Sequence, residues 1–480
     1  MTAAEGTARD GVMAPARRAN SVGLVLVITL VGFEVMAIAT VMPRVSRDLR
    51  GIGLYGWVFS AFLLTSLLGI VLAGRLADRH GPARPFLLGL LLFSAGLVLG
   101  GLAPSMPVLV LGRAVQGLGA GAIPTVVYVV IGRAYPPALQ PRMFAVLSSA
   151  WVLPALIGPA LAALITAALG WRWVFLALLP VVAGAGALAL RSIRLLRPVE
   201  SASSADRASA TDAVRVALGT GLLLGGLTAP GPVPLLALVA VGITIGVRPL
   251  RRLVPPGTLR GRPGPPAAVL ARGLLTFAFF GTDAFVTLAV QDVRGAGVAL
   301  GGVALAAGGV AWTTGSWTQQ HAIHRVGPAR LVQTGFVVVA LGIGLFSIAI
   351  LPTVPTATFV VAWAVAGFGI GLAYAPISIV VLDAAERGQE GRASTAVQLT
   401  DLLGCAIGIG IGGALVAWGE RAGWDPARAL HLGAGIDILV ACGGALLAVR
   451  LRRPGATSGT VAGGATAMPG PSSAATGGAT

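Results

Sequence analysis

The sequence consists mainly of long apolar runs separated by short segments that carry arginine, and this pattern restricts the possible folds more than any other feature. Residues 22–38 and 86–102 are two such runs. Runs of about 17–25 apolar residues are typical of membrane-spanning helices, because a backbone in lipid must satisfy its hydrogen bonds within its own segment. The chain is 56% hydrophobic and 11% charged, whereas a soluble domain carries roughly 25% charged residues. The sequence therefore predicts an all-α integral membrane protein.

The number of runs and the placement of charge predict the topology. We count about fourteen spans, which leaves tails at 1–21 and 454–480, and the second tail is rich in Gly, Ala, Ser and Thr and is expected to be disordered. All 34 basic residues are arginine, and most lie in segments on the side of the two termini. Since positive residues gather in cytoplasmic loops, we expect a multi-pass plasma-membrane protein with both termini in the cytoplasm. The net charge of +17 is spread over many loops, so no nucleic-acid partner is expected.

A short basic loop occurs twice, as RHGPAR at 79–84 and RVGPAR at 325–330. Other stretches repeat in the same order at a spacing of about 250 residues, such as 114–121 with 364–371 and 32–34 with 281–283. This order predicts two homologous six-helix bundles, at 22–190 and 267–453, joined by a linker at 191–266 that holds two extra helices. Internal repeats of this kind are typical of secondary transporters, whose substrate site lies between the two halves.

A few ionisable residues fall inside the predicted spans, where a charge costs at least ~2.5–3.5 kcal/mol. Glu34 and Asp283 lie at similar depths in corresponding helices, so we expect each half to present one carboxyl group to a central cavity. A carboxyl group away from water is more easily protonated near neutral pH, and competition between a proton and a substrate for it gives antiport. A structural role in pairing with a neighbour remains open. The candidates for proton coupling or substrate binding are Glu34, Arg113, Asp283, Asp401 and Asp437.

Arg113 is present in one half only, because Trp363 occupies the corresponding position of the second half. A buried cation needs an anionic or carbonyl partner. One hypothesis is that Arg113 modulates the protonation of Glu34, and the alternative is a structural contact between the first and fourth helices. Asp401 and Asp437 could both line the cavity.

Several motifs resemble those of the major facilitator superfamily, and in particular its fourteen-helix branch of drug:proton antiporters. The loop between the second and third helices, GRLADRHG at 74–81, is similar to the family's loop at that place. The stretches at 34–43, 111–121 and 151–162 are similar to its motifs in the first, fourth and fifth helices. The sequence departs from the family at Pro82-Ala83, where a basic pair is usual, at Glu34, where Asp is usual, and at His324, which stands opposite Asp78.

The resemblance implies roles for two groups of residues. The loop would hold the halves together on the cytoplasmic side when the outer side is open, with Gly74 allowing close helix packing and Asp78 accepting hydrogen bonds or pairing with an arginine. The fifth helix would bend at its prolines, and its motif implies antiport. The loop residues are Gly74, Asp78, Arg79, Gly81 and Arg84, and the fifth-helix residues are Pro154, Gly158 and Pro159.

Together these features predict a proton-coupled transporter that exports amphipathic small molecules, including cationic ones, by alternating access. Its partners would be the substrate, protons and the lipid bilayer. A transporter dedicated to one metabolite or lipid is an alternative, and a non-transporting membrane sensor or assembly partner is another. No set of residues suggests an enzyme, a metal site or a cofactor.

Overall fold

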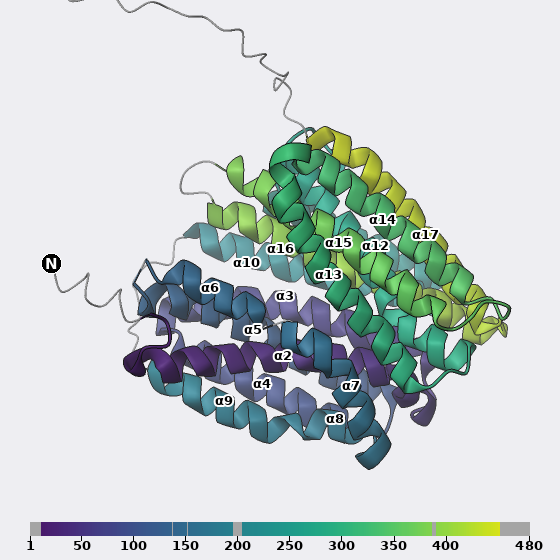
Figure 1. Cartoon of the computed structure of the whole chain (residues 1–480), viewed down its shortest axis with the longest axis horizontal. Helices are drawn as coiled ribbons and strands as arrows, with labels where there is room; N and C mark the ends of the chain where they lie inside the picture. Colours follow the sequence, from purple (N-terminus) through teal and green to yellow (C-terminus); the bar gives the residue numbers. More distant parts are fainter. Residues whose placement is uncertain (1–10, 137, 151, 195–203, 386–389, 452–480) are drawn as a thin grey trace, which may run out of the picture.

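The computed structural model describes residues 11–136, 138–150, 152–194, 204–385 and 390–451, which are predominantly helical (Figure 1). The tail at 454–480 lies outside these residues. The first half contains α2 (Pro15–Asp48), α3 (Tyr55–His80), α4 (Ala83–Gly101), α5 (Met106–Ala134), α6 (Gln140–Ser149), α7 (Val152–Leu169), α8 (Arg172–Leu176) and α9 (Leu178–Ile193). An intervening pair follows, α10 (Ser204–Thr228) and α11 (Pro232–Leu253). The second half contains α12 (Pro265–Leu288), α13 (Val298–Val326), α14 (Pro328–Ala349), α15 (Thr358–Asp383), α16 (Glu390–Ala422) and α17 (Pro426–Ala448).

The helices are long and apolar enough for a multi-pass membrane protein. Within the described ranges, 13 helical segments have the length and composition to cross a membrane, and Leu153–Leu169 is a shorter apolar helix. This shorter helix follows α6 and contains most of the stretch at 151–162 that the sequence assigns to the fifth helix. The prediction of an all-α membrane protein with about fourteen spans is therefore confirmed.

The fifth span is broken earlier than its Gly-Pro pair suggests. Helix α6 ends at Ser149 and α7 begins at Val152, while Pro159 lies inside α7 without ending it. Pro154 has no N–H to donate to the carbonyl four residues before it, so a helix weakens upstream of this residue. The sequence predicts a bend at the prolines of this helix, and the break between α6 and α7 lies on the N-terminal side of Pro154, the first of them.

Corresponding helices of the two halves pack through corresponding glycines. A Cβ atom at Gly117 of α5 would collide with the backbone of Phe62 in α3. In the second half, a Cβ atom at Gly367 of α15 would collide with the backbone of Gly308 in α13. Small residues allow such close approach of helices in lipid, where van der Waals packing drives association.

The intervening helices lie across one side of the contact between the halves. Helix α10 packs against α3 of the first half and α16 of the second. Trp57 Nε1 donates to Thr228 Oγ1 over 3.0 Å, and Arg421 Nη1 donates to the Thr228 carbonyl over 3.1 Å. Since only 11% of the most apolar window of α11 is buried, this helix presents its surface to the surrounding lipid.

The two halves meet at one end of the molecule and diverge toward the end that carries the N-terminus (Figure 1). Gly56 of α3 lies so close to α16 that a Cβ atom there would be 2.7 Å from Gly413 Cα. Polar contacts join α2 and α3 to α12 and the π-helix η3 (Ala289–Val293) at this closed end. They are Tyr55 to the Ala284 carbonyl, Thr287 to the Ala39 carbonyl, Gln291 to the Thr40 carbonyl and Arg47 to Asp292.

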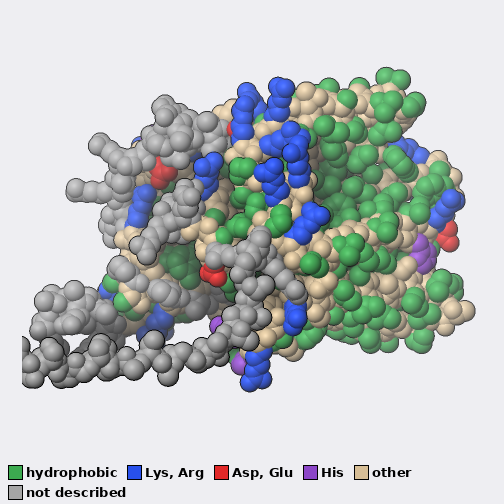
Figure 2. Space-filling view, turned by 90° about the horizontal axis from the view of Figure 1, so that it is seen from above, with side chains coloured by type: hydrophobic (Ala, Val, Ile, Leu, Met, Phe, Trp, Pro, Cys, Tyr) green, Lys and Arg blue, Asp and Glu red, His purple; other side chains and the backbone are tan. Residues whose placement is uncertain are grey.

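The outer surface has the charge distribution of a membrane protein. Figure 2 shows a wide apolar face beside a row of arginine and lysine positions, which in this chain are all arginine. Exposed arginines at the diverging end, in the segment that leads from α11 to α12, include Arg251, Arg252, Arg260 and Arg262. The basic row therefore lies at the end that carries the N-terminus, next to the apolar belt.

Candidate functional site

A buried ion pair joins the first and fourth spans of the first half. Arg113 Nη1 of α5 donates to Glu34 Oε1 of α2, and both side chains are at most 2% exposed. The same Arg113 nitrogen donates to Gln116 Oε1 over 2.7 Å, and Nε donates to the Val58 carbonyl over 3.2 Å. The guanidinium also lies 4.1 Å from the ring centre of Phe62. The contact between Glu34 and Arg113 that the sequence suggested is therefore present in the structure.

The pair leaves one atom of Glu34 available. Glu34 Oε2 is buried and has no hydrogen-bond partner. A buried charged oxygen without a partner is unfavourable, and uptake of a proton there would remove the negative charge of the carboxyl group. Proton uptake would also remove the negative charge that compensates Arg113. The protonation state of Glu34 is therefore expected to affect the packing of α5, which carries Arg113.

The second half has a counterpart of this pair, in which the partner of the carboxyl group is a neutral side chain. Trp363 Nε1 of α15 donates to Asp283 Oδ1 of α12 over 2.8 Å. Trp363 stands at the repeat position of Arg113, and Asp283 at that of Glu34. Asp283 is half-buried, and within the described ranges no ion pair includes it. The repeat thus places a carboxyl group in each half, with a cationic partner in only one.

A second buried arginine was missed by sequence reasoning. Arg272 is not among the candidate residues taken from the sequence, but it lies within α12 and is 1% exposed. Its Nε is 3.8 Å from Asp401 Oδ1 of α16, and its guanidinium lies 3.5 Å from the ring centre of Tyr374 in α15. A basic residue two turns into a span resembles a flanking loop residue in sequence. Only its distance from the start of the span, seven residues after Pro265, could have indicated burial.

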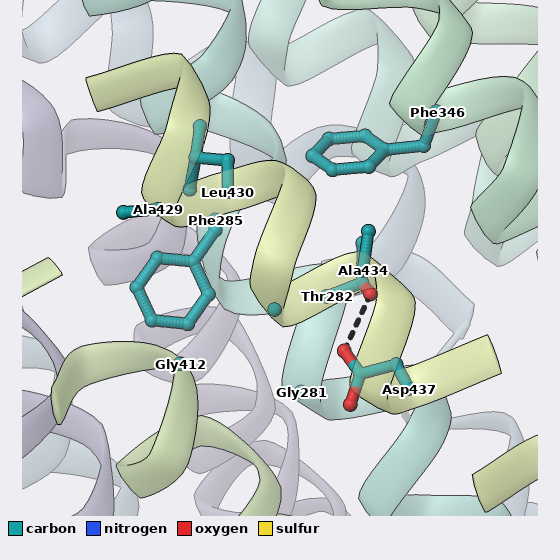
Figure 3. Close-up of a pocket in the computed structure, with 10 residues that line it drawn as sticks. Gly281, Thr282, Phe285, Phe346, Gly412, Ala429, Leu430, Ala434 and Asp437 are labelled. Atoms are coloured by element: carbon teal, nitrogen blue, oxygen red, sulfur yellow. Dashed lines mark hydrogen bonds between the residues drawn. The ribbon is translucent and has the colours of Figure 1, made fainter. Parts of the chain in front are cut away.

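Asp437 does not lie between the halves, in contrast to the expectation that it lines the central cavity. It is 4% exposed and accepts a 2.7 Å hydrogen bond from Thr282 Oγ1, as Figure 3 shows. The residues around this small pocket, including Phe285 and Phe346, all come from α12, α14, α16 and α17. The depth of Asp437 in the membrane can be estimated from its position along the span. The sequence does not show which helices surround that span, so it does not show whether Asp437 faces the central cavity.

The loop that follows α3 is stabilised within its own half. Asp78 Oδ1 lies 3.5 Å from Arg133 Nη2 at the end of α5. Gly81 has a φ of 78°, and Gly327 in the repeated loop has a φ of 83°, which explains why both copies keep this glycine. Gly74 has open space around a Cβ position, so the expected tight packing is absent here, where the halves diverge. Arg79 and Arg84 are exposed.

The fifth-span motif lies where α7 contacts both α2 and the second half. A Cβ atom at Gly158 would be 3.3 Å from Met36 Cβ, two residues from Glu34. Pro159 Cβ would lie 3.2 Å from a Cβ atom at Gly302 in α13. Pro154 is buried. The motif therefore packs against α2, the helix that carries Glu34, and against the second half.

A comparison of the sequence with models of known protein families identifies the family of this chain. The model described as the Major Facilitator Superfamily matches residues 24–341, which include Glu34, Arg113 and both copies of the basic loop. The chain belongs to the Major Facilitator Superfamily. It is a multi-pass membrane protein, and its family consists of transporters.

Relatives with efflux names are similar over different parts of the chain. A probable multidrug-efflux transporter of Mycobacterium tuberculosis is 26% identical over 424 residues, which cover 84% of this chain and 88% of that protein. Multidrug resistance protein 3 of Bacillus subtilis is 33% identical over 168 residues, which cover 35% of this chain and 32% of that protein. The matched part thus spans under two thirds of this second relative.

Solved structures show the same fold. An auto-inhibited peptide transporter of the POT family has a TM-score of 0.67 at 15% identity, with 90% of this chain and 97% of that chain covered. A bacterial homolog of the human lysosomal transporter Spinster, in an inward-facing conformation, has a TM-score of 0.63 at 18% identity, with 91% and 98% covered. At these identities the likeness concerns the fold alone.

Proposed function

We propose that this chain is a proton-coupled antiporter that exports amphipathic small molecules, including cationic ones, by alternating access. It would work in the plasma membrane with both termini in the cytoplasm. The row of exposed arginines at the end that carries the N-terminus supports this orientation, because positive residues favour the cytoplasmic side. The efflux names of several relatives support export.

The observation that carries the proposal is the buried pair of Glu34 and Arg113. A proton on Glu34 neutralises the carboxylate and leaves Arg113 with Gln116 and the Val58 carbonyl as its polar partners. Loss of the proton restores the ion pair. Because a buried charge without a counter-charge is strongly unfavourable, the two protonation states favour different packing of α2 against α5. This difference can bias the transporter between its two open states.

Asp283 supplies the carboxyl group on the other side of the substrate path. It is half-buried and receives a hydrogen bond from Trp363. Phe279 stacks on Trp363 with ring centres 5.1 Å apart, so the carboxyl group lies beside an aromatic surface. Such a combination suits an amphipathic cation, whose charge meets the carboxylate and whose rings meet the aromatic side chains.

The two motifs would control the conformational change. The loop residues Gly74, Asp78, Arg79, Gly81 and Arg84 would join the halves when the cytoplasmic end closes, and in the present state Asp78 instead pairs with Arg133 of its own half. Pro154, Gly158 and Pro159 would transmit movement of α7 to α2 and α13, which they contact at Met36 and Gly302.

A transport assay in proteoliposomes tests the proposal. Purified protein would face an imposed pH gradient and a panel of lipophilic cationic dyes, with an ionophore that collapses the gradient as the control. Gradient-dependent movement of several dyes is the expected result. Movement of none of the dyes, with a well-folded protein, would reject multidrug export in favour of a transporter dedicated to one metabolite or lipid.

A further inference from the structure

The second half contains a polar cluster that has no counterpart in the first half. Arg272 Nη2 donates to the Tyr374 carbonyl over 2.8 Å and also to Ser378 Oγ. Tyr374 Oη donates to Asp401 Oδ2 over 3.2 Å. The stretch of α2 that corresponds to Arg272, residues 22–23, has no charged side chain. The cluster therefore did not arise simply as a copy of the Glu34–Arg113 pair.

The ion pair within the cluster is close but not hydrogen-bonded. Arg272 Nε and Asp401 Oδ1 are 3.8 Å apart, and both atoms are buried without a hydrogen-bond partner. Arg272 is held by Tyr374 and Ser378, which are neutral. Asp401 can therefore gain or lose a proton without breaking any of the hydrogen bonds that hold Arg272. The hydrogen bonds that hold the Arg272 cation are therefore independent of the charge on Asp401.

Asp401 is less completely buried than Glu34. Its side chain is 23% exposed, whereas that of Glu34 is 1% exposed. On α12, Arg272 precedes Asp283 by eleven residues, or about 16 Å of helix, and it lies nearer to the diverging end. The charged and titratable groups that face Asp401, among the described residues, are Arg272 from α12, Tyr374 from α15 and Cys405 on α16 itself.

We propose that Asp401 is a second proton site and that Arg272 is its positioning residue, so that each export cycle exchanges two protons. This inference rests on the proposed proton antiport. One proton moves from water to the Asp401 carboxylate, which becomes a neutral carboxyl group, and it returns to water on the opposite side of the membrane. Arg272 keeps its proton and its hydrogen bonds throughout, and its charge holds Asp401 ionised until the proton arrives.

The number of protons can be measured through the response to membrane potential. Exchange of two protons for a monovalent cation such as ethidium moves net charge, whereas exchange of one proton does not. In proteoliposomes, wild-type export of ethidium should respond to both a pH gradient and a potassium-diffusion potential. Asp401→Asn should keep the response to the pH gradient and lose the response to the potential. Asp437→Asn, a buried carboxyl variant away from the contact between the halves, should behave as wild type.

Changes at Arg272 test the positioning role. In Arg272→Gln the Asp401 carboxylate loses the cation that favours its charged form, so the pH dependence of ethidium export should move to higher pH by about one unit or more. Arg272→Lys should restore most of the wild-type pH dependence. If Arg272→Gln fails to fold, as judged by size-exclusion chromatography, Asp401→Asn and Arg272→Lys still decide the question.

The outcomes separate this inference from the proposed function. A wild-type response to the pH gradient, together with an unchanged response of Asp401→Asn to the potential, would reject Asp401 as a proton site. A wild-type pH dependence in folded Arg272→Gln would reject the positioning role. Absence of any gradient-driven export in wild type would instead reject the proposed antiport itself.

Discussion

Removing one charge of the Glu34–Arg113 pair should destabilise the protein more than removing both. Glu34→Gln keeps the size of the side chain but leaves the Arg113 charge with Gln116, the Val58 carbonyl and the Phe62 ring. Arg113→Gln leaves the Glu34 carboxyl group instead. The double variant leaves two neutral amides in the same space.

The sizes of these effects follow from the burial of both side chains, which are at most 2% exposed. Removal of one partner from a buried ion pair costs about 3–5 kcal/mol, and Glu34→Gln should fall in this range because arginine keeps its proton. Arg113→Gln should cost less, since Glu34 can become neutral by binding a proton. Replacement of both partners is often close to neutral, so the double variant should be more stable than Glu34→Gln by at least about 2 kcal/mol.

The free energy of unfolding of the four proteins can be compared by SDS titration in dodecylmaltoside micelles. Asp283→Asn is a suitable control, because Asp283 has the neutral donor Trp363 and this change should cost only about 1 kcal/mol. Effects of the two single changes that simply add in the double variant, within about 0.5 kcal/mol, would refute a direct interaction between these charges.

Three further predictions concern the rest of the molecule. Gly56→Leu would place a side chain against the backbone of Gly413, at a cost of about 1–3 kcal/mol to the closed end, and should reduce dye export while the protein still inserts into membranes. Asp78→Asn should bind dye normally, as measured by fluorescence polarisation, but transport it slowly, and normal transport would count against a role in switching. Asp437→Asn should leave pH-driven dye export within about twofold of wild type, because its surroundings come from the second half alone.

The fold and part of the site could be predicted from sequence because membrane insertion depends on local composition. Apolar length predicts each span, and the repeated loops predict two related halves. The depth of Glu34 and Asp283 follows from their distance along a helix, and a buried Arg113 must find an anionic or carbonyl partner. These arguments predict the contact between Glu34 and Arg113.

The sequence-based expectations failed where the surroundings of a residue depend on how the helices are arranged around the bundle. Arg272 is near the start of a span and was not recognised as a buried residue, although α15 supplies Tyr374 and Ser378 to hold it in the interior. Asp437 has a suitable depth but lies on α17, which packs within the second half. Packing at Gly74 depends on which end of the transporter is open, and sequence contains no direct signal of that state.

The most direct test of the account is the proton released when substrate binds. Purified wild type in weakly buffered detergent solution would be mixed with ethidium while a pH-sensitive dye reports the change in proton concentration. Coupling between ethidium binding and the proton on Glu34 predicts proton release from wild type and a clear reduction in Glu34→Gln, with ethidium binding measured in parallel by fluorescence. If Glu34→Gln binds ethidium and releases as many protons as wild type, Glu34 does not couple substrate to protons and the central claim is wrong.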